Sequence, residues 1–228
     1  MPERFALISA PAAVRATFGY PDTPDFPPRY NIAPTQPIAI VSARPHAGGL
    51  VRRFDLARWG FLPGFVRNPE EFPLLIKAQA ETLTERPSFR AAVKRRRCLV
   101  PADGYYEWRR GGRRRTFLIR RPDRAPIGLA GLTETWIDPY GGEIDTACIV
   151  TTRANALVAP IADRMPAILS AADFAAWLDN DGVAAEAAVA LLGPAPEGAL
   201  EMIAIGDAVN RVDAQGPALQ RPLDQAGP

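Results

Sequence analysis

The residue that most needs a chemical explanation is Glu107, an acid that stands between aromatic residues in the sequence Tyr105-Tyr106-Glu107-Trp108. We predict a short buried strand over residues 98–100, a reversal at Asp103-Gly104 and a second strand over residues 105–108. A two-residue period places Tyr105 and Glu107 on one face of that second strand. Desolvation beside aromatic surface would raise the pKa of Glu107 and suit it to acid-base chemistry. The alternative is a solvated glutamate on a half-buried edge strand.

This segment resembles the signature of the SOS-response-associated peptidase (SRAP) family, whose members act on abasic sites in single-stranded DNA. Further blocks match in the order of that family. They are Arg29-Tyr30-Asn31-Ile32-Ala33-Pro34-Thr35-Gln36, Arg58-Trp59-Gly60-Phe61-Leu62-Pro63, Ala78-Gln79-Ala80-Glu81-Thr82, Pro87-Ser88-Phe89-Arg90, Ile149-Val150-Thr151-Thr152, Asp163-Arg164-Met165-Pro166, and Val209-Asn210 followed by Pro217. The likeness extends over about residues 1–220, so we expect one SRAP-like domain there and a C-terminal tail over residues 221–228.

The N-terminus departs from the family it resembles. Members begin Met-Cys-Gly-Arg-Phe, lose the methionine, and use the thiol and amine of the exposed cysteine to form a thiazolidine with the ring-opened abasic sugar. This chain begins Met1-Pro2-Glu3-Arg4-Phe5. The shared Arg4-Phe5 fixes the register, so Pro2 occupies the cysteine position and offers no thiol. The resemblance therefore implies that the thiazolidine cross-link is lost.

Three other positions of the family's site also differ here. Ala162 stands where the family has a histidine, Lys77 replaces an asparagine, and Gln79 replaces a phosphate-contacting arginine. Glu107 alone is retained among the principal catalytic positions. The resemblance implies DNA-binding roles for Arg4, Asn31, Gln79, Thr151 and Arg164, with Phe65 where members place an aromatic wedge.

Three functions remain open on these residues. In the first, the protein binds single-stranded DNA, at abasic sites, within the DNA damage (SOS) response and has lost the family's chemistry. In the second, it is an abasic-site lyase. The amine of Pro2, exposed if Met1 is removed, or that of Lys77 attacks the sugar aldehyde, and Glu107 shuttles the proton. In the third, the fold is a non-catalytic protein-interaction module whose acidic C-terminal third is the contact surface. The family is peptidase-like and hydrolase-like by name, but the replaced residues leave enzymatic activity open.

Lysine is scarce in this chain, which makes Lys77 conspicuous. Only two of the 27 basic residues are lysines, the others being arginines. A lysine in the pocket is compatible with a need for an amine that can lose its proton, which arginine cannot supply. The simpler alternative is that Lys77 contacts a phosphate.

The charge distribution is compatible with a nucleic-acid partner but does not require one. Residues 94–124 contain twelve basic and three acidic side chains, whereas residues 131–228 contain four basic and fourteen acidic ones. A basic middle segment is suited to a phosphate-binding groove. The alternatives are a solvated hairpin tip at residues 113–115 and a helix C-terminus at residues 94–97.

Metal and cofactor chemistry is not expected. Cys98 and Cys148 lie in apolar runs, which favours buried structural cysteines over a disulfide. The single histidine, His46, lies in an Arg-Pro-His-Ala-Gly-Gly sequence with the composition of a loop. Because no segment has the length of a membrane span or the pattern of a signal peptide, we expect a cytoplasmic protein without a membrane partner. The sequence does not define the oligomeric state, for which a monomer is the expectation.

Many short strands with a few helices predict an α+β fold. We expect strands over 38–42, 51–59, 116–119, 127–132 and 146–152, helices over 12–18, 88–94, 171–178 and 183–192, and a hairpin turn at 138–142. Such a pattern indicates a curled mixed β-sheet or barrel-like core with peripheral helices. The SRAP resemblance implies the same architecture.

Overall fold

Five strands pair in a closed ring and form a barrel. In the computed structural model, which describes residues 3–109, 115–138 and 140–223, the ring runs β10–β4–β3–β6–β9 and back to β10. The members are β3 (Pro37–His46), β4 (Gly49–Trp59), β6 (Arg97–Ala102), β9 (Ile127–Ile137) and β10 (Glu143–Arg153). β10 pairs with β4 in parallel, and the other pairs in the ring are antiparallel. Short strands extend the ring, since β5 (Lys77–Gln79) and β11 (Arg164–Pro166) pair with β10, and β12 (Ile168–Leu169) pairs with β9.

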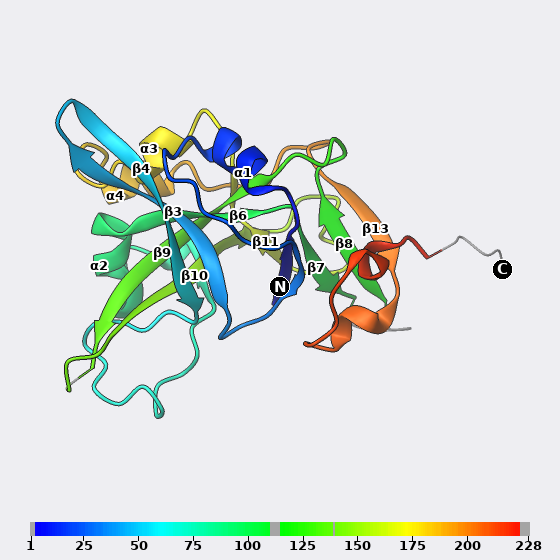
Figure 1. The fold of residues 1–228 in the computed structure, drawn as a ribbon, viewed down its shortest axis with the longest axis horizontal. Helices are drawn as coiled ribbons and strands as arrows, with labels where there is room; N and C mark the ends of the chain where they lie inside the picture. Colours follow the sequence, from blue (N-terminus) through cyan, green and yellow to red (C-terminus); the bar gives the residue numbers. More distant parts are fainter. Residues whose placement is uncertain (1–2, 110–114, 139, 224–228) are drawn as a thin grey trace.

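A second, antiparallel sheet lies beside the barrel. Its strand order is β13–β8–β7–β1–β2. The members are β1 (Arg4–Leu7), β2 (Arg29–Ile32), β7 (Gly104–Trp108), β8 (Thr116–Arg120) and β13 (Glu201–Ile205). Figure 1 shows β7, β8 and β13 on one side of the barrel and helices α2, α3 and α4 on the other. The predicted α+β fold with a barrel-like core is therefore confirmed.

The helices are short and lie at the periphery. They are α1 (Pro11–Phe18), α2 (Pro87–Arg95), α3 (Phe174–Leu178) and α4 (Ala185–Val189), with 3₁₀ turns at Ala80–Thr82, Asp207–Asn210 and Pro217–Gln220. Proline at the first turn favours the start of both longer helices, because its missing N–H has no partner to lose there. The helices predicted over 171–178 and 183–192 are only five residues long each. Asp179 ends the first one with a non-helical ψ of 85° and accepts a hydrogen bond from the Gly182 amide.

The predicted reversal at Asp103-Gly104 is wrong. β6 pairs with β3 and β9, whereas β7 pairs with β1 and β8, so the chain crosses here from the barrel to the second sheet. The Asp103 carboxylate fixes the crossing by accepting hydrogen bonds from the backbone amides of Ile8 and Ser9 at 2.5 and 2.7 Å, and from the Ser9 hydroxyl. Gly104 serves close packing, because a Cβ there would lie 2.8 Å from the carbonyl oxygen of Ile119.

His46 lies in a strand and not in the loop that composition predicted. β3 continues to His46, which pairs with Gly49 across a tight hairpin. The glycines at 48 and 49 have φ of +101° and +141°, which explains why the glycine-rich sequence can turn so sharply. The strand predicted over 38–42 is thus the first half of a longer one.

Arg97 belongs to the core, so the basic cluster at residues 94–97 divides into two parts. Lys94 and Arg95 occupy the exposed last turn of α2. Arg97 is fully buried in β6, and its guanidinium donates to four backbone carbonyls, those of Val93, Trp177, Asp179 and Val183. Burial lowers the pKa of Arg97, with an opposing effect of Asp179. This arginine holds α2, α3 and β6 together and offers no groove contact.

The two cysteines are buried structural residues. Cys98 and Cys148 are both free and completely inaccessible in the barrel. Burial raises the pKa of both thiols. None of the helices in the described part of the chain combines the length and apolarity needed to cross a membrane.

Candidate functional site

Three strand ends meet around a hollow of about 300 Å³. Gln79 is the last residue of β5, Trp108 the last of β7 and Arg164 the first of β11, and residues 159–163 complete the lining. Two of the predicted DNA-binding residues, Gln79 and Arg164, are therefore brought together from sequence positions 85 residues apart. Ala162, at the position of the family's histidine, also lines the hollow.

Arg164 is held in place by Thr151 and Glu81. Its Nε donates to Thr151 Oγ1 at 3.1 Å, and one terminal nitrogen lies 2.7 Å from both the Thr151 carbonyl oxygen and Glu81 Oε2. Thr151 is fully buried, and its hydroxyl donates to the Ala78 carbonyl oxygen at 3.1 Å. Thr151 thus lies beneath Arg164 and orients it.

The contact with Arg164 also affects the pKa of the Glu81 carboxyl. Its partial burial raises the pKa of the carboxyl, but the hydrogen bond and the charge of Arg164 outweigh that effect and hold the pKa below its usual range. Glu81 is therefore an anion at neutral pH and competes with any bound anion for the same guanidinium.

Lys77 forms an ion pair with Glu3. Its Nζ lies 3.3 Å from Glu3 Oε1, and the two side chains are 27% and 52% exposed. The parallel pairing of β5 with β10 places Lys77 opposite Ile149 and Gln79 opposite Thr151, so one short strand carries both predicted residues. Sequence reasoning missed Glu3 and Glu81. The available signal for Glu3 was that it and Lys77 introduce opposite charges at two positions where the resembled family is uncharged.

Glu107 is buried among its neighbours. It is 1% exposed, and β7 lies between β1 and β8, so the solvated edge-strand alternative is wrong. Burial raises the pKa of Glu107, Glu3 raises it further, and the charge of Lys77 lowers it. The predicted direction of the pKa is confirmed, and the three side chains lie close enough for their charges to interact.

The two-residue period of β7 is also confirmed. Tyr105, on the face of Glu107, packs in the main core of the barrel and has its pKa raised by burial and by Glu107. Tyr106 and Trp108 pack in a separate cluster on the other face. The Tyr106 hydroxyl donates to the Tyr30 carbonyl oxygen at 2.6 Å.

Asn31 lies inside the protein and organises the C-terminal segment. Its amide nitrogen donates to the carbonyl oxygens of Val209, Arg211 and Ala214 at 2.8–3.2 Å, and its oxygen accepts from Arg4 at 3.0 Å. The same Arg4 nitrogen donates to the Val209 carbonyl oxygen at 3.0 Å. Asn31 is fully buried, whereas Arg4 is partly exposed. Of this pair, only Arg4 presents a side chain at the surface.

Phe65, the predicted aromatic wedge, does not line the hollow. Phe65 is 61% exposed on the irregular segment after β4, with its ring 6.3 Å from that of Phe72 and nearly perpendicular to it. Pro2 lies outside the described residues, as do Arg113 and Arg114 of the predicted hairpin tip. Arg115 is exposed. Within the described ranges, no three histidine, cysteine, aspartate or glutamate side chains gather as metal ligands.

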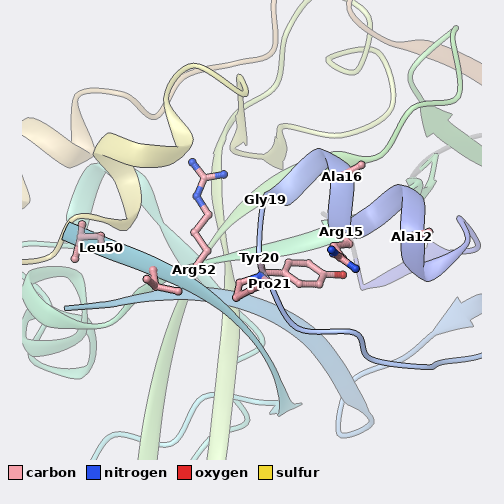
Figure 2. A pocket seen from close by; sticks show the side chains of 9 residues that line it. Ala12, Arg15, Ala16, Gly19, Tyr20, Pro21, Leu50 and Arg52 are labelled. Carbon is pink, nitrogen blue, oxygen red and sulfur yellow. The ribbon is translucent and has the colours of Figure 1, made fainter. Parts of the chain in front are cut away.

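A larger hollow of about 770 Å³ lies between α1 and the β3–β4 hairpin. Figure 2 shows Arg15 and Tyr20 on one side of it and Leu50 and Arg52 on the other. Arg52 is already engaged, since it donates to the Phe18 carbonyl oxygen at 2.7 Å and lies over the ring of Phe174. None of the predicted site residues in the described ranges lines this hollow, so the smaller hollow at the strand ends is the candidate site.

Comparison with known proteins defines the class. The sequence matches the family described as SOS response associated peptidase (SRAP) over residues 1–212, and the chain therefore belongs to the SRAP family. It is 32% identical to the abasic site processing protein YoqW of Bacillus subtilis (strain 168), with 86% of each chain covered. It is 30% identical to the abasic site processing protein YedK of Escherichia coli (strain K12), with 86% of this chain and 85% of the relative covered.

Solved structures share the fold of this chain. A crystal structure of a protein from Bacteroides thetaiotaomicron superposes with a TM-score of 0.81 at 25% identity, over 97% of this chain and all of the other. A protein from Bordetella bronchiseptica gives a TM-score of 0.75, also at 25% identity, over 90% of this chain and 99% of the other.

Proposed function

We propose that this protein binds single-stranded DNA at abasic sites and does not form the thiazolidine cross-link of its family. The observation that carries the proposal is the placement of Arg164, which Thr151 orients toward a hollow next to Gln79 and Trp108. An oriented guanidinium suits a backbone phosphate, and an indole at the rim suits a base. The relatives' description as abasic site processing proteins supports the same substrate.

The loss of the cross-link follows from the cysteines. Pro2 occupies the position of the family's nucleophile, and both cysteines of the chain are buried in the barrel with raised thiol pKa values. A buried neutral thiol is inert toward an aldehyde on DNA. We expect no heat-stable adduct with the wild-type chain, and partial recovery of one with Pro2→Cys.

In this proposal the predicted DNA-binding residues have two kinds of role. Arg4, Gln79 and Arg164 contact the strand, and Phe65 supports it as an exposed aromatic wedge. Asn31 and Thr151 act as positioning residues, because each is fully buried and hydrogen-bonded to one of the arginines. We further propose that residues 1–220 form one domain that acts as a monomer in the cytoplasm in the response to DNA damage.

A second candidate function is an abasic-site lyase. The observation that favours it is the coupling of Lys77, Glu3 and the buried Glu107. An amine adds to the sugar aldehyde and, with one proton taken up, loses water to form an iminium ion. A base then removes the proton from C2, and the 3′ phosphate leaves with the electron pair of its C–O bond. Lys77 or the Pro2 amine would be the nucleophile, and Glu107, whose pKa is raised, would accept the proton.

The test uses an abasic single-stranded oligonucleotide with and without borohydride. The chain has only two lysines, so Lys94→Arg on the exposed face of α2 is a matched control for Lys77→Arg. Intact mass first establishes whether Met1 is present. Salt-sensitive binding without an adduct supports the binding protein. An adduct that Lys77→Arg abolishes and Lys94→Arg retains supports the lyase through Lys77, and one that maps to the N-terminal peptide supports Pro2.

The outcome that refutes both candidates is the absence of any preference for single-stranded abasic DNA over intact duplex. The third function, a protein-interaction module, would then remain. Glu107→Gln distinguishes the two DNA-based candidates further, because it leaves binding intact but slows strand cleavage by about 10²-fold if Glu107 moves the proton.

A further inference from the structure

Three arginines gather at the end of β7 opposite to the candidate site. Arg120, Arg124 and Arg221 line a hollow of about 510 Å³, together with residues of the β1 end, β2, the Asp103 crossing and the last 3₁₀ turn. β7 begins just after Asp103, which lines this hollow, and ends at Trp108, which lines the candidate site. We propose that this hollow, the arginine pocket, binds a phosphate group.

Two of the three guanidiniums are available to contact a ligand. Arg120 Nε lies 2.8 Å from Glu201 Oε1 and is largely covered. Arg124 and Arg221 are exposed, and within the described ranges neither side chain has a hydrogen bond or an ion pair. The acid in the lining, Asp103, accepts hydrogen bonds from Ile8 and Ser9. The pocket therefore has more positive charge to offer than its own acid neutralises.

Hydrogen bonds within the protein fix the turn that carries Arg124 before any ligand binds. Asp123 accepts a hydrogen bond from Arg121 Nε at 2.8 Å and from the Ala125 amide at 3.0 Å, and the Arg124 amide donates to the Arg121 carbonyl oxygen. This geometry holds Arg124 at φ +60°, a left-handed conformation that favours glycine. An arginine held at a position where glycine would be more stable is a candidate for function.

Hydrogen bonds also fix the segment that leads to Arg221. Gln220 donates to the Tyr106 hydroxyl at 3.0 Å, and that hydroxyl donates to the Tyr30 carbonyl oxygen. These bonds tie the last 3₁₀ turn, which precedes Arg221, to the second sheet. Forked guanidiniums on fixed turns favour a phosphate group, which accepts two hydrogen bonds from each.

The length of β7 relates this pocket to DNA. At about 3.3 Å per residue, the five residues of β7 separate the two hollows by about 17 Å. That distance corresponds to about five nucleotides of a stacked strand. The phosphate therefore has two possible sources, a DNA strand that also occupies the candidate site or a free phosphorylated molecule.

The first arm of the test measures thermal unfolding with and without inorganic phosphate, at ionic strength held constant with chloride. Phosphate should raise the unfolding temperature of the wild type and of Arg95→Ala, an exposed arginine on α2, but not of Arg124→Gly or Arg221→Ala. Arg124→Gly is the sharper variant, because it relieves the left-handed strain. It should unfold at a higher temperature than the wild type without phosphate while losing the phosphate effect. An equal phosphate effect in all four proteins, or none in the wild type, overturns the proposal.

The second arm distinguishes the sources with abasic single strands of four and fourteen nucleotides. If the phosphate belongs to DNA, Arg124→Gly and Arg221→Ala should each bind the long strand several-fold more weakly and the short strand normally. If both strands bind normally while the phosphate effect is lost, the site takes a free phosphorylated molecule. The arginine pocket does not depend on the proposed function, since loss of abasic DNA binding would leave the first arm unchanged.

Discussion

Replacing Arg164 with glutamine should weaken single-stranded DNA binding in a manner that depends on salt. The guanidinium is already oriented by Thr151, so its contact with a phosphate needs little rearrangement. Loss of one charge-assisted hydrogen bond costs about 1.5–3 kcal/mol, which is about a 10- to 150-fold loss of affinity. The fold should survive, because the ion pair with Glu81, whose carboxylate side chain is 42% exposed, contributes only about 1 kcal/mol.

The salt dependence is what identifies the lost contact as electrostatic. Each phosphate contact on a single strand contributes about 0.7 to the slope of log affinity against log salt. The ratio of wild-type to variant affinity should therefore fall about 2.6-fold between 50 and 200 mM salt. Fluorescence anisotropy with a labelled abasic single strand measures this ratio, and Arg95→Gln on α2 is the control.

Glu81→Gln changes the other partner of the same ion pair and should have the opposite effect on DNA binding. It removes the anion that competes for Arg164 and should strengthen binding several-fold. The reasoning would be refuted if Arg164→Gln bound DNA with the same affinity and salt slope as the wild type. It would also be refuted if Glu81→Gln weakened binding.

Three further predictions concern the fold that positions the site. Folding raises the pKa of Glu107, so the free energy of unfolding should fall as the pH rises from the unfolded pKa of about 4.3 through the folded value. Glu107→Gln should abolish this fall in urea denaturation. An unchanged pH profile in the variant would contradict the prediction. Gly104→Ala should cost about 1–3 kcal/mol in urea denaturation, because the Cβ meets the Ile119 carbonyl oxygen at 2.8 Å, whereas Gly206→Ala, which meets nothing within 4 Å, should be neutral or stabilising. Arg97→Met should lower the free energy of unfolding by about 3–5 kcal/mol through the buried carbonyls it leaves unpaired, and a loss below about 1 kcal/mol would contradict that account.

The local sequence pattern correctly predicted the features that depend on the alternation of side chains along a strand and on their burial. The aromatic residues around Glu107 predicted both its face of the strand and the direction of its pKa, because a strand alternates its side chains whatever it pairs with. The barrel-like core followed from the number and shortness of the strands. Two of the predicted residues, Gln79 and Arg164, do line one hollow.

The local sequence pattern gave wrong predictions where a hydrogen-bond partner far away in the sequence determines the structure. An Asp-Gly pair predicts a turn, but here the carboxylate bonds the backbone near Ser9, and this contact makes a crossing between sheets. Arg97 belongs to a run of basic residues that predicts an exposed cluster. Its hydrogen-bond partners at residues 177–183 lie more than 75 positions away in the sequence, and they bury it. Asn31 likewise bonds residues 209–214, which no pattern around position 31 could indicate.

The closed barrel also has a consequence for how this chain folds. β4 cannot complete its pairing until β10 exists, and the two are separated by the whole middle of the chain. During synthesis, the outer edge of β4 in the β3–β4 hairpin therefore stays unpaired while α2, β6 and β9 are made. Because such non-local closure is slow, we expect ring closure to limit the folding rate, and the unpaired edge of β4 to be the place where aggregation begins if it is delayed.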